Sequence, residues 1–146
     1  MKRWNGLWIR MLPKIDRSYR LDANPMGFGS LWIKAGGDRV QLAFDDGQSI
    51  QTVRAKAGCW TVNQCDMRGV QPTLGGHLPG EQRERLVAAV SCAEEEGKIV
   101  LSVRFRTSPH TQRWEIEAGG EGLRISFAEP EGPSGDWKEE QVLTGR

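Results

Sequence analysis

Hydrophobic and polar residues alternate most regularly between residues 85 and 129. In KIVLSVRFRT (98–107) every second residue from Ile99 to Phe105 is apolar, and Ser102, Arg104 and Arg106 occupy the other face. The same alternation recurs in RLVAAVSCA, QRWEIEA and LRISF. A period of two residues is typical of a strand with one buried face. The pattern therefore predicts four antiparallel strands joined by short turns.

The apolar faces also predict which residues lie opposite one another, because an inward residue must pair with an inward residue. We expect Phe105 to lie opposite Trp114 in the neighbouring strand. We also expect Ile116 to lie opposite Leu123 in the strand after that, and the two pairings together place Glu115 between Arg104 and Arg124. We therefore predict a ladder of ion pairs on the solvent face, rather than an anion site at these arginines.

The N-terminal half repeats the alternation more weakly in SLWIKAGGDRVQLAF, FDDGQSIQTVRA and CWTVN. The Asp-Gly pair in the second of these segments is typical of a hairpin turn. Together the two halves predict about eight short strands and no helix. The expected fold class is all-β, a single antiparallel barrel or sandwich with a lipocalin-like meander.

The length of 146 residues fits one domain. We expect residues 1–17 to be an N-terminal linker or packing segment, and residues 18–129 to form the β domain. Residues 130–146 are polar and are expected to be a disordered tail. The Gly- and Pro-rich segment 66–82 is expected to be a long loop that is functional or mobile.

Charge and composition restrict the class of partner. Lys and Arg total 20 against 19 Asp and Glu, a balance that argues against a nucleic-acid-binding surface. No apolar run reaches the roughly 18 residues that a membrane helix needs. The basic N-terminus is interrupted by Arg10 and Lys14 before an apolar region forms, so we expect no signal peptide. A cytoplasmic location is the default expectation.

Motifs that carry catalysis are missing from the sequence. It contains no Ser-x-x-Lys, no Gly-x-Ser-x-Gly, no phosphate-binding loop and no His-Glu-x-x-His. We therefore predict that the chain by itself is not an enzyme and uses no cofactor. His110 is expected to be a solvated turn residue, whereas His77 lies in the long loop and is the more interesting histidine.

A metal site would have to combine His77 with Cys59 and Cys65. Their Cys-x5-Cys spacing is wider than that of recognisable zinc sites, so no metal is predicted. Cys59, Cys65 and Cys92 are expected to be thiols that pack as small hydrophobic residues. A Cys59–Cys65 disulfide is the lesser alternative.

Tryptophans are the remaining candidates for a binding surface. Trp114 lies on an inward face and is expected in the core, and core packing is also the favoured role of Trp32 and Trp60. Alternation nevertheless places Trp32 on a second, partly exposed face. The candidate ligand-binding or interface residues are Trp4, Trp8, Trp32, Trp60 and His77.

One stretch of the chain resembles a known family. The pattern consists of Tyr19-x-Leu21-x-x-Asn24-Pro25-x-Gly27-Phe28, Leu31-Trp32-Ile33, Gly58-Cys59-Trp60 and the run GKIVLSVRFRTSPHTQRWEIEAGGEGLRISF. Over residues 18–128 it resembles the small β domain that follows the catalytic domain in penicillin-binding-protein-like (class C β-lactamase-like) serine hydrolases. The Ser-Pro-His sequence at 108–110 departs from the Thr-Pro-aromatic pattern of that family.

The resemblance implies a non-catalytic C-terminal accessory domain, because the family's catalytic residues belong to the preceding domain and none matches a residue here. Such a domain would pack on a catalytic serine hydrolase domain or mediate self-association. The alternative is a free-standing lipocalin-like protein that binds a small apolar ligand. Large inward residues such as Leu101, Phe105, Trp114 and Phe127 favour a filled core. An independent enzyme that uses His77 is the third alternative.

Overall fold

Every regular element in the described part of the chain is a β-strand. The computed structural model describes residues 2–4, 7–66, 85–106, 111–131 and 136–146. The strands are β1 (Lys2–Trp4), β2 (Leu7–Ile9), β3 (Leu12–Arg20), β4 (Ser30–Gly37), β5 (Arg39–Asp45), β6 (Ile50–Ala57), β7 (Thr61–Asp66), β8 (Arg85–Glu95), β9 (Lys98–Phe105), β10 (Thr111–Ala118), β11 (Leu123–Glu131) and β12 (Asp136–Gly145). The predicted all-β class is confirmed. These residues contain no helix able to cross a membrane.

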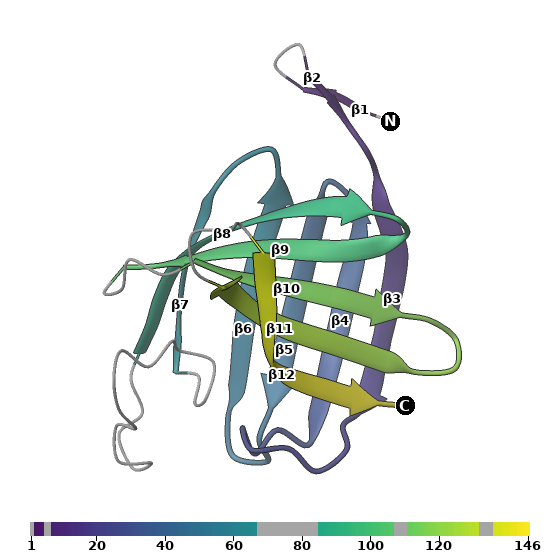
Figure 1. Ribbon diagram of the computed structural model, residues 1–146. Helices are drawn as coiled ribbons and strands as arrows, with labels where there is room; N and C mark the ends of the chain where they lie inside the picture. The colour runs from purple at the N-terminus through teal and green to yellow at the C-terminus, as the bar shows by residue number, and fades with distance from the viewer. Residues whose placement is uncertain (1, 5–6, 67–84, 107–110, 132–135) are drawn as a thin grey trace.

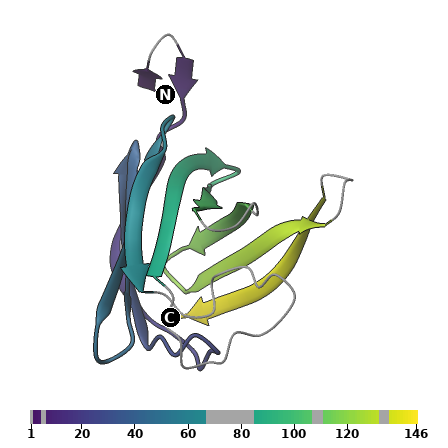
Figure 2. The same cartoon turned by 90° about the vertical axis from the view of Figure 1, so that its left-hand side faces the viewer.

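Ten strands form one sheet in the order β12-β11-β10-β9-β8-β6-β5-β4-β3, with β7 paired to β8. All neighbours are antiparallel except β6 and β8, which pair in parallel at Lys56–Ser91 and Ala57–Cys92. The sheet curls into a half-barrel, so that β3–β6 form one wall and β8–β12 lean across it (Figures 1 and 2). β1 and β2 form a separate hairpin. The sheet therefore has more strands than the eight expected.

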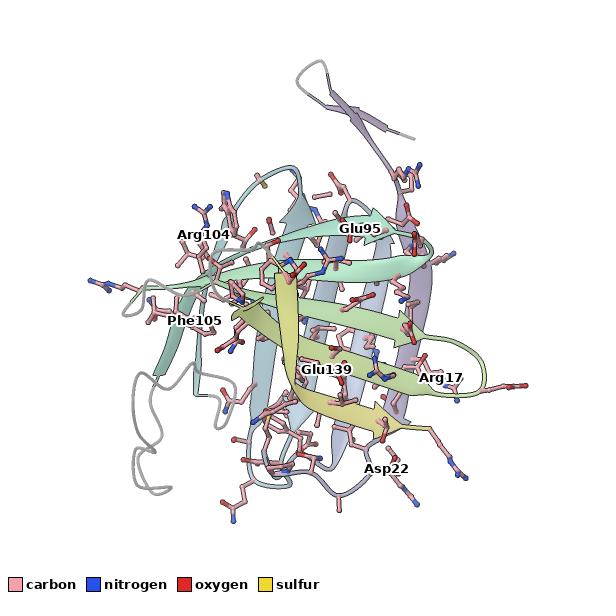
Figure 3. The ribbon with its side chains drawn as sticks, in the orientation of Figure 1. Arg17, Asp22, Glu95, Arg104, Phe105 and Glu139 are labelled. Carbon is pink, nitrogen blue, oxygen red and sulfur yellow. The ribbon has the colours of Figure 1, made fainter. Side chains whose placement is uncertain are left out.

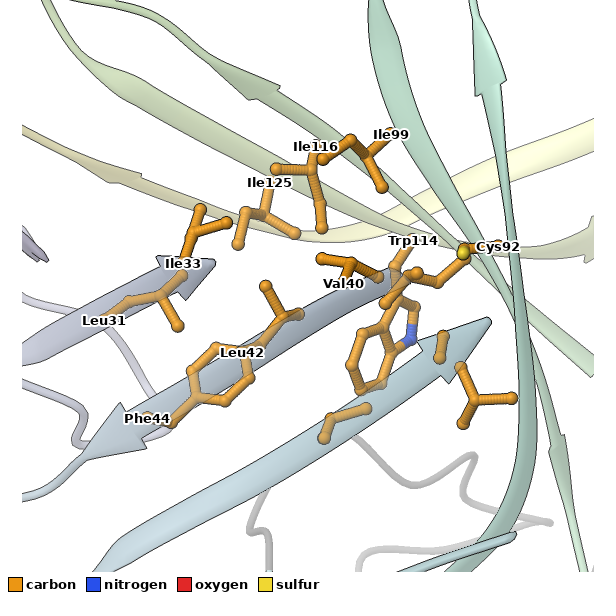
Figure 4. Packing of buried hydrophobic residues seen from close by; sticks show 14 of the residues in the cluster. Leu31, Ile33, Val40, Leu42, Phe44, Cys92, Ile99, Trp114, Ile116 and Ile125 are labelled. Atoms are coloured by element: carbon orange, nitrogen blue, oxygen red, sulfur yellow. The ribbon is translucent and has the colours of Figure 1, made fainter. Parts of the chain in front are cut away.

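The core lies between the two walls and is formed by their inward faces (Figure 4). Trp114 is fully buried, as predicted, and its indole Nε1 donates a hydrogen bond of 3.0 Å to Oε1 of Gln112. Its ring meets that of Phe127 edge-on at a centroid distance of 5.0 Å. Burial of each large apolar side chain contributes about 1.5–3 kcal/mol, so this shared face is the main source of stability.

The predicted register between β9 and β10 is wrong. Trp114 lies opposite Leu101 rather than Phe105, and Arg104 lies opposite Thr111. The predicted register between β10 and β11 is wrong as well, because Ile116 lies opposite Ile125 rather than Leu123. All of these differences are even numbers of residues, so each of these side chains keeps its predicted face. Alternation determines which face a residue takes. The turn between the strands decides which partner it meets.

The ion-pair ladder consequently has different members from those predicted. Glu115 accepts a hydrogen bond from Lys98 Nζ at 2.9 Å, and Arg124 pairs with Glu139, also at 2.9 Å. Arg104 instead lies over the ring of Trp60, with its guanidinium carbon 4.8 Å from the ring centroid. A solvent-face ladder exists as expected, but between other residues.

The expectation of a disordered tail is also wrong, because residues 136–145 form β12. Leu143 is buried in the core, and the end of β12 pairs with the end of β3. Arg20 and Arg146 exchange backbone N–H···O=C bonds of 2.9 Å in both directions, and Asp22 N–H donates to the Thr144 carbonyl. Long-range pairing orders this segment, and its polar composition carries no sign of that.

β3 belongs to the sheet, so the domain begins before residue 18. Its free edge is covered by the turn between β10 and β11 (Figure 3). Nη1 of Arg17 donates to the carbonyls of Gly119 and Gly120 at 3.1 and 2.8 Å, and the buried Tyr19 hydroxyl donates to Gly119 at 3.3 Å. Tyr19 therefore anchors β3 to the opposite wall.

The Asn-Pro-Met-Gly segment that follows β3 is an architectural turn. Nδ2 of Asn24 donates to the carbonyls of Asp22 and Phe28, and Oδ1 of Asn24 accepts from the Phe28 N–H. Gly27 has φ of 75°, a left-handed conformation that glycine adopts without strain. One side chain and one glycine thus reverse the chain before β4.

Replacement of Gly145 by alanine should open the contact between β3 and β12. A Cβ at this position would lie 2.5 Å from the Arg20 carbonyl oxygen, so the backbone must move. We expect Gly145→Ala to lower the free energy of unfolding by about 1–3 kcal/mol, measured by urea denaturation. In the control Gly120→Ala the added methyl group meets nothing within 4 Å. Equal stabilities of the two variants would contradict this account of the contact.

Candidate functional site

The tryptophans predicted as site residues do not form one site in the described part of the chain. Trp32 is half-buried on the outer face of β4, and its Nε1 donates to Oδ1 of Asp16 at 2.9 Å. Trp60 is 46% exposed ahead of β7 and packs against Arg104. The backbone of Trp4 and Trp8 lies in the β1–β2 hairpin. His77 lies outside the described residues, as does His110.

A basic groove on the outer face of β4, β5 and β6 is the best-formed candidate site. Its volume is about 520 Å³, within the usual range of small-molecule sites. Ten described residues line the groove, of which four are cationic and none is acidic. The polar side chains that line this groove are those of Lys34, Arg39, Gln41, Arg54, Lys56 and Thr61.

The register of the three strands places these side chains in two rows. Lys34, Gln41 and Arg54 pair across β4, β5 and β6 and form the first row. Arg39 and Lys56 pair across β5 and β6 and form the second. All five are outward because their sequence neighbours belong to the buried face. The cations gather through strand pairing and not through a sequence motif.

The positive charge of the groove is only weakly neutralised. In the described part of the chain Lys34, Arg54 and Lys56 form no ion pair with a carboxylate. Nε of Arg39 is 3.9 Å from Oδ1 of Asp38, but the Arg39 side chain is 77% exposed, so this pair contributes little. The groove is therefore suited to a negatively charged ligand.

β3 adds one charge of each sign beside the groove. Asp16 lies opposite Lys34 and already accepts a hydrogen bond from Trp32. Lys14 lies beside Gly36, where an added Cβ would be 3.9 Å from Cγ of the lysine. The net charge around the groove stays positive.

Asn63 holds the groove's edge in place at the point where the sheet divides. Its side chain is buried, Oδ1 accepts from the Arg54 N–H at 2.7 Å, and Nδ2 donates to the Arg54 carbonyl at 2.8 Å. A second bond of 3.1 Å runs from Nδ2 to the Thr61 carbonyl. One amide group thus replaces a strand partner for β6 and joins it to β7. No sequence signal distinguishes this asparagine.

The two halves of the chain differ in charge. Residues 1–66 contain ten Lys and Arg against six Asp and Glu, whereas residues 67–146 contain ten against thirteen. The overall charge of +1 conceals this separation. Counting charges along the chain would reveal the separation, but the strand pairing is needed to show that the cations share one groove.

Acidic residues of the second wall are mostly paired. Lys98 Nζ lies 2.7 Å from Glu117 and 2.9 Å from Glu115. Both hydrogen bonds raise the pKa of Lys98, and the bond to Glu117 has the larger effect. The bond between Lys98 and Glu117 also lowers the pKa of Glu117. Hydrogen bonds from Ser126 and then Arg124 lower the pKa of Glu139. This face is an internally compensated ladder.

The cysteines are thiols where the structure describes their side chains. Cys59 is half-buried and free, so the Cys59–Cys65 disulfide is not formed, and Cys92 is buried. Burial, followed by the charges of Asp38 and Cys59, raises the pKa of Cys92 to about 12. The described residues contain no group of three or more His, Cys, Asp or Glu placed to hold a metal ion.

Comparisons with known proteins assign this chain to no family. No family model matches the sequence, and neither a curated protein nor a solved structure matches the chain. The resemblance to the accessory domain of β-lactamase-like hydrolases therefore stays a prediction. The geometry of the groove carries the functional argument.

Replacement of Asn63 by alanine should weaken the junction of β6 and β7. The change removes the side-chain partners of the Arg54 N–H and carbonyl from two partly buried hydrogen bonds. We expect a loss of about 1–3 kcal/mol in the free energy of unfolding, measured by urea denaturation. Gln64→Ala, at the exposed neighbouring position of β7, is the matched control and should change stability little. A loss in Gln64→Ala as large as that in Asn63→Ala would count against this role.

Cys92 should resist modification in the folded protein. Its pKa of about 12 keeps the thiol protonated at pH 8, and the thiolate is the reactive form. In a Cys65→Ser background we expect one rapid reaction, at Cys59, with a colorimetric thiol reagent, and a second only after unfolding. The rate at Cys92 should rise as the pH approaches 12. Rapid labelling of Cys92 at pH 8, located by peptide mass spectrometry, would contradict the burial.

Proposed function

We propose that this chain is a non-catalytic accessory domain that binds a negatively charged ligand or partner through the basic groove. The observation that carries the proposal is the set of four cationic side chains around one groove, whose described lining residues include no acidic one. The groove offers cations, an amide and a hydroxyl, which are groups that bind anions.

The inner face of the half-barrel supports a structural role for the core. Trp114, Phe44 and Leu101 are fully buried there and pack with the other inward residues (Figure 4). This packing gives less support to the alternative of a small apolar ligand inside the barrel. A surface site leaves the core intact and is compatible with a rigid scaffold.

The resemblance to the accessory domain of β-lactamase-like serine hydrolases suggests a context for the groove. In that context the groove would contact an acidic surface of the catalytic domain, or of a second copy. Electrostatic complementarity of this kind steers association and selects the partner. The exposed Trp60 packs against Arg104 and does not line the groove, so this contact does not need it.

Removal of two groove cations should weaken binding to an anionic surface more than removal of two cations elsewhere. We expect the double variant Arg54→Gln/Lys56→Gln to elute from a sulfonate cation-exchange column at lower salt than the natural chain. The control Arg20→Gln/Arg146→Gln loses the same charge from exposed positions at the other end of the sheet. Because both variants have the same net charge, equal elution would argue against the groove as the anion-binding face.

A further inference from the structure

We propose that the ligand of the basic groove is a compact polyphosphate, a small molecule that carries at least two linked phosphate groups. This inference rests on the proposed function and narrows it from anions in general to one chemical class. It is carried by three features of the groove: the spacing of its cations, the kind of donors it presents and the limited extent of its charge.

The spacing favours a ligand with more than one anionic group. Arg39 and Lys56 lie on adjacent strands, about 4.8 Å apart in the hydrogen-bonding direction. Lys34 and Arg54 lie two strands apart, about 9.6 Å, and the two rows are separated by two residues, or about 6.8 Å. A single tetrahedral anion is too small to contact the cations of both rows at once. Two or three linked anions can contact both rows.

The donors suit the oxygens of phosphate groups. An arginine guanidinium donates two parallel hydrogen bonds to a phosphate, and a lysine ammonium acts as a point charge beside it. Gln41 lies between Lys34 and Arg54 in the first row and offers a neutral amide donor. Asn63 fixes the backbone of Arg54 through two hydrogen bonds, so the point from which this side chain extends is set before a ligand binds.

The limited extent of positive charge favours a compact ligand over a nucleic acid or an extended polyanion. The next row towards the other end of the sheet is formed by Trp32, Ala43 and Thr52, and the row after it includes Asp45. On β4, β5 and β6 the positive charge therefore ends after two rows, and Arg20 of β3 shares the row of Asp45. A polyanion that tracks along the sheet would leave the cations and meet a carboxylate.

Titration calorimetry of the full chain at constant ionic strength tests the proposal. The probes are inorganic orthophosphate, pyrophosphate and tripolyphosphate. We expect the affinity to rise at least tenfold from orthophosphate to tripolyphosphate, because each added charge-assisted hydrogen bond contributes that factor or more. Lys34→Gln and Lys56→Gln, one from each row, should each weaken tripolyphosphate binding at least tenfold. Arg20→Gln should leave it unchanged, and urea denaturation verifies that all variants fold.

Three results would overturn the proposal. They are equal affinities for orthophosphate and tripolyphosphate, tripolyphosphate binding that persists in both groove variants, and absence of binding to all three probes. If the groove variants still elute early from the cation-exchange column, the proposed function stands and only the ligand class is wrong. A dimer in light scattering that dissociates in Arg54→Gln would instead assign the groove to a second copy.

A second experiment distinguishes a lipid headgroup from a soluble molecule as the source of the phosphate groups. Co-sedimentation with phosphatidylcholine vesicles that contain a phosphoinositide bisphosphate, and not with phosphatidylcholine alone, would identify a lipid headgroup as the source. Binding of soluble tripolyphosphate without co-sedimentation would identify a soluble ligand. Either result supports the class of ligand, because both present linked or neighbouring phosphates to the same two rows.

Discussion

Closure of the curled sheet onto β3 is the interaction on which the rest of the structure depends. A half-barrel has two edge strands whose backbone groups require partners, and an inner face that must be kept from water. The end of β12 pairs with the end of β3, and the β10–β11 turn accepts hydrogen bonds from Arg17 and Tyr19. These contacts bring the two walls together, so the core between them is buried.

The groove is a consequence of that closure. Once the inner faces of β4, β5 and β6 are committed to the core, their alternate residues must point outward, and several of these are cations. Asn63 then links β6 to β7 where the sheet divides and gives the groove a fixed edge. The alternation of side chains along each strand thus both fills the core and places the cations on the outer face.

Paired and unpaired charges distinguish the two walls. On β9–β12 Lys98 forms ion pairs with Glu115 and Glu117, and Arg124 forms one with Glu139. The charges on this wall therefore neutralise one another and support the fold. On β4–β6 the described cations have weak partners or none. Exposed ion pairs contribute little to stability, and cations of like charge gathered in one groove repel one another. This arrangement supports the proposed binding role of the groove.

The sequence by itself determined the all-β class, the inward face of the apolar residues in the strands it predicted and the burial of Trp114. These follow from local alternation, which depends only on the pleat. Alternation also predicted the partly exposed face of Trp32, which is half-buried on the outer face of β4, whereas the cations of the groove were not among the predicted site residues. Tertiary structure decided the register, the strand at 136–145, the role of Asn63 and the convergence of the cations. Each of these depends on contacts between residues far apart in the chain, and alternation within one segment carries no information about its partner.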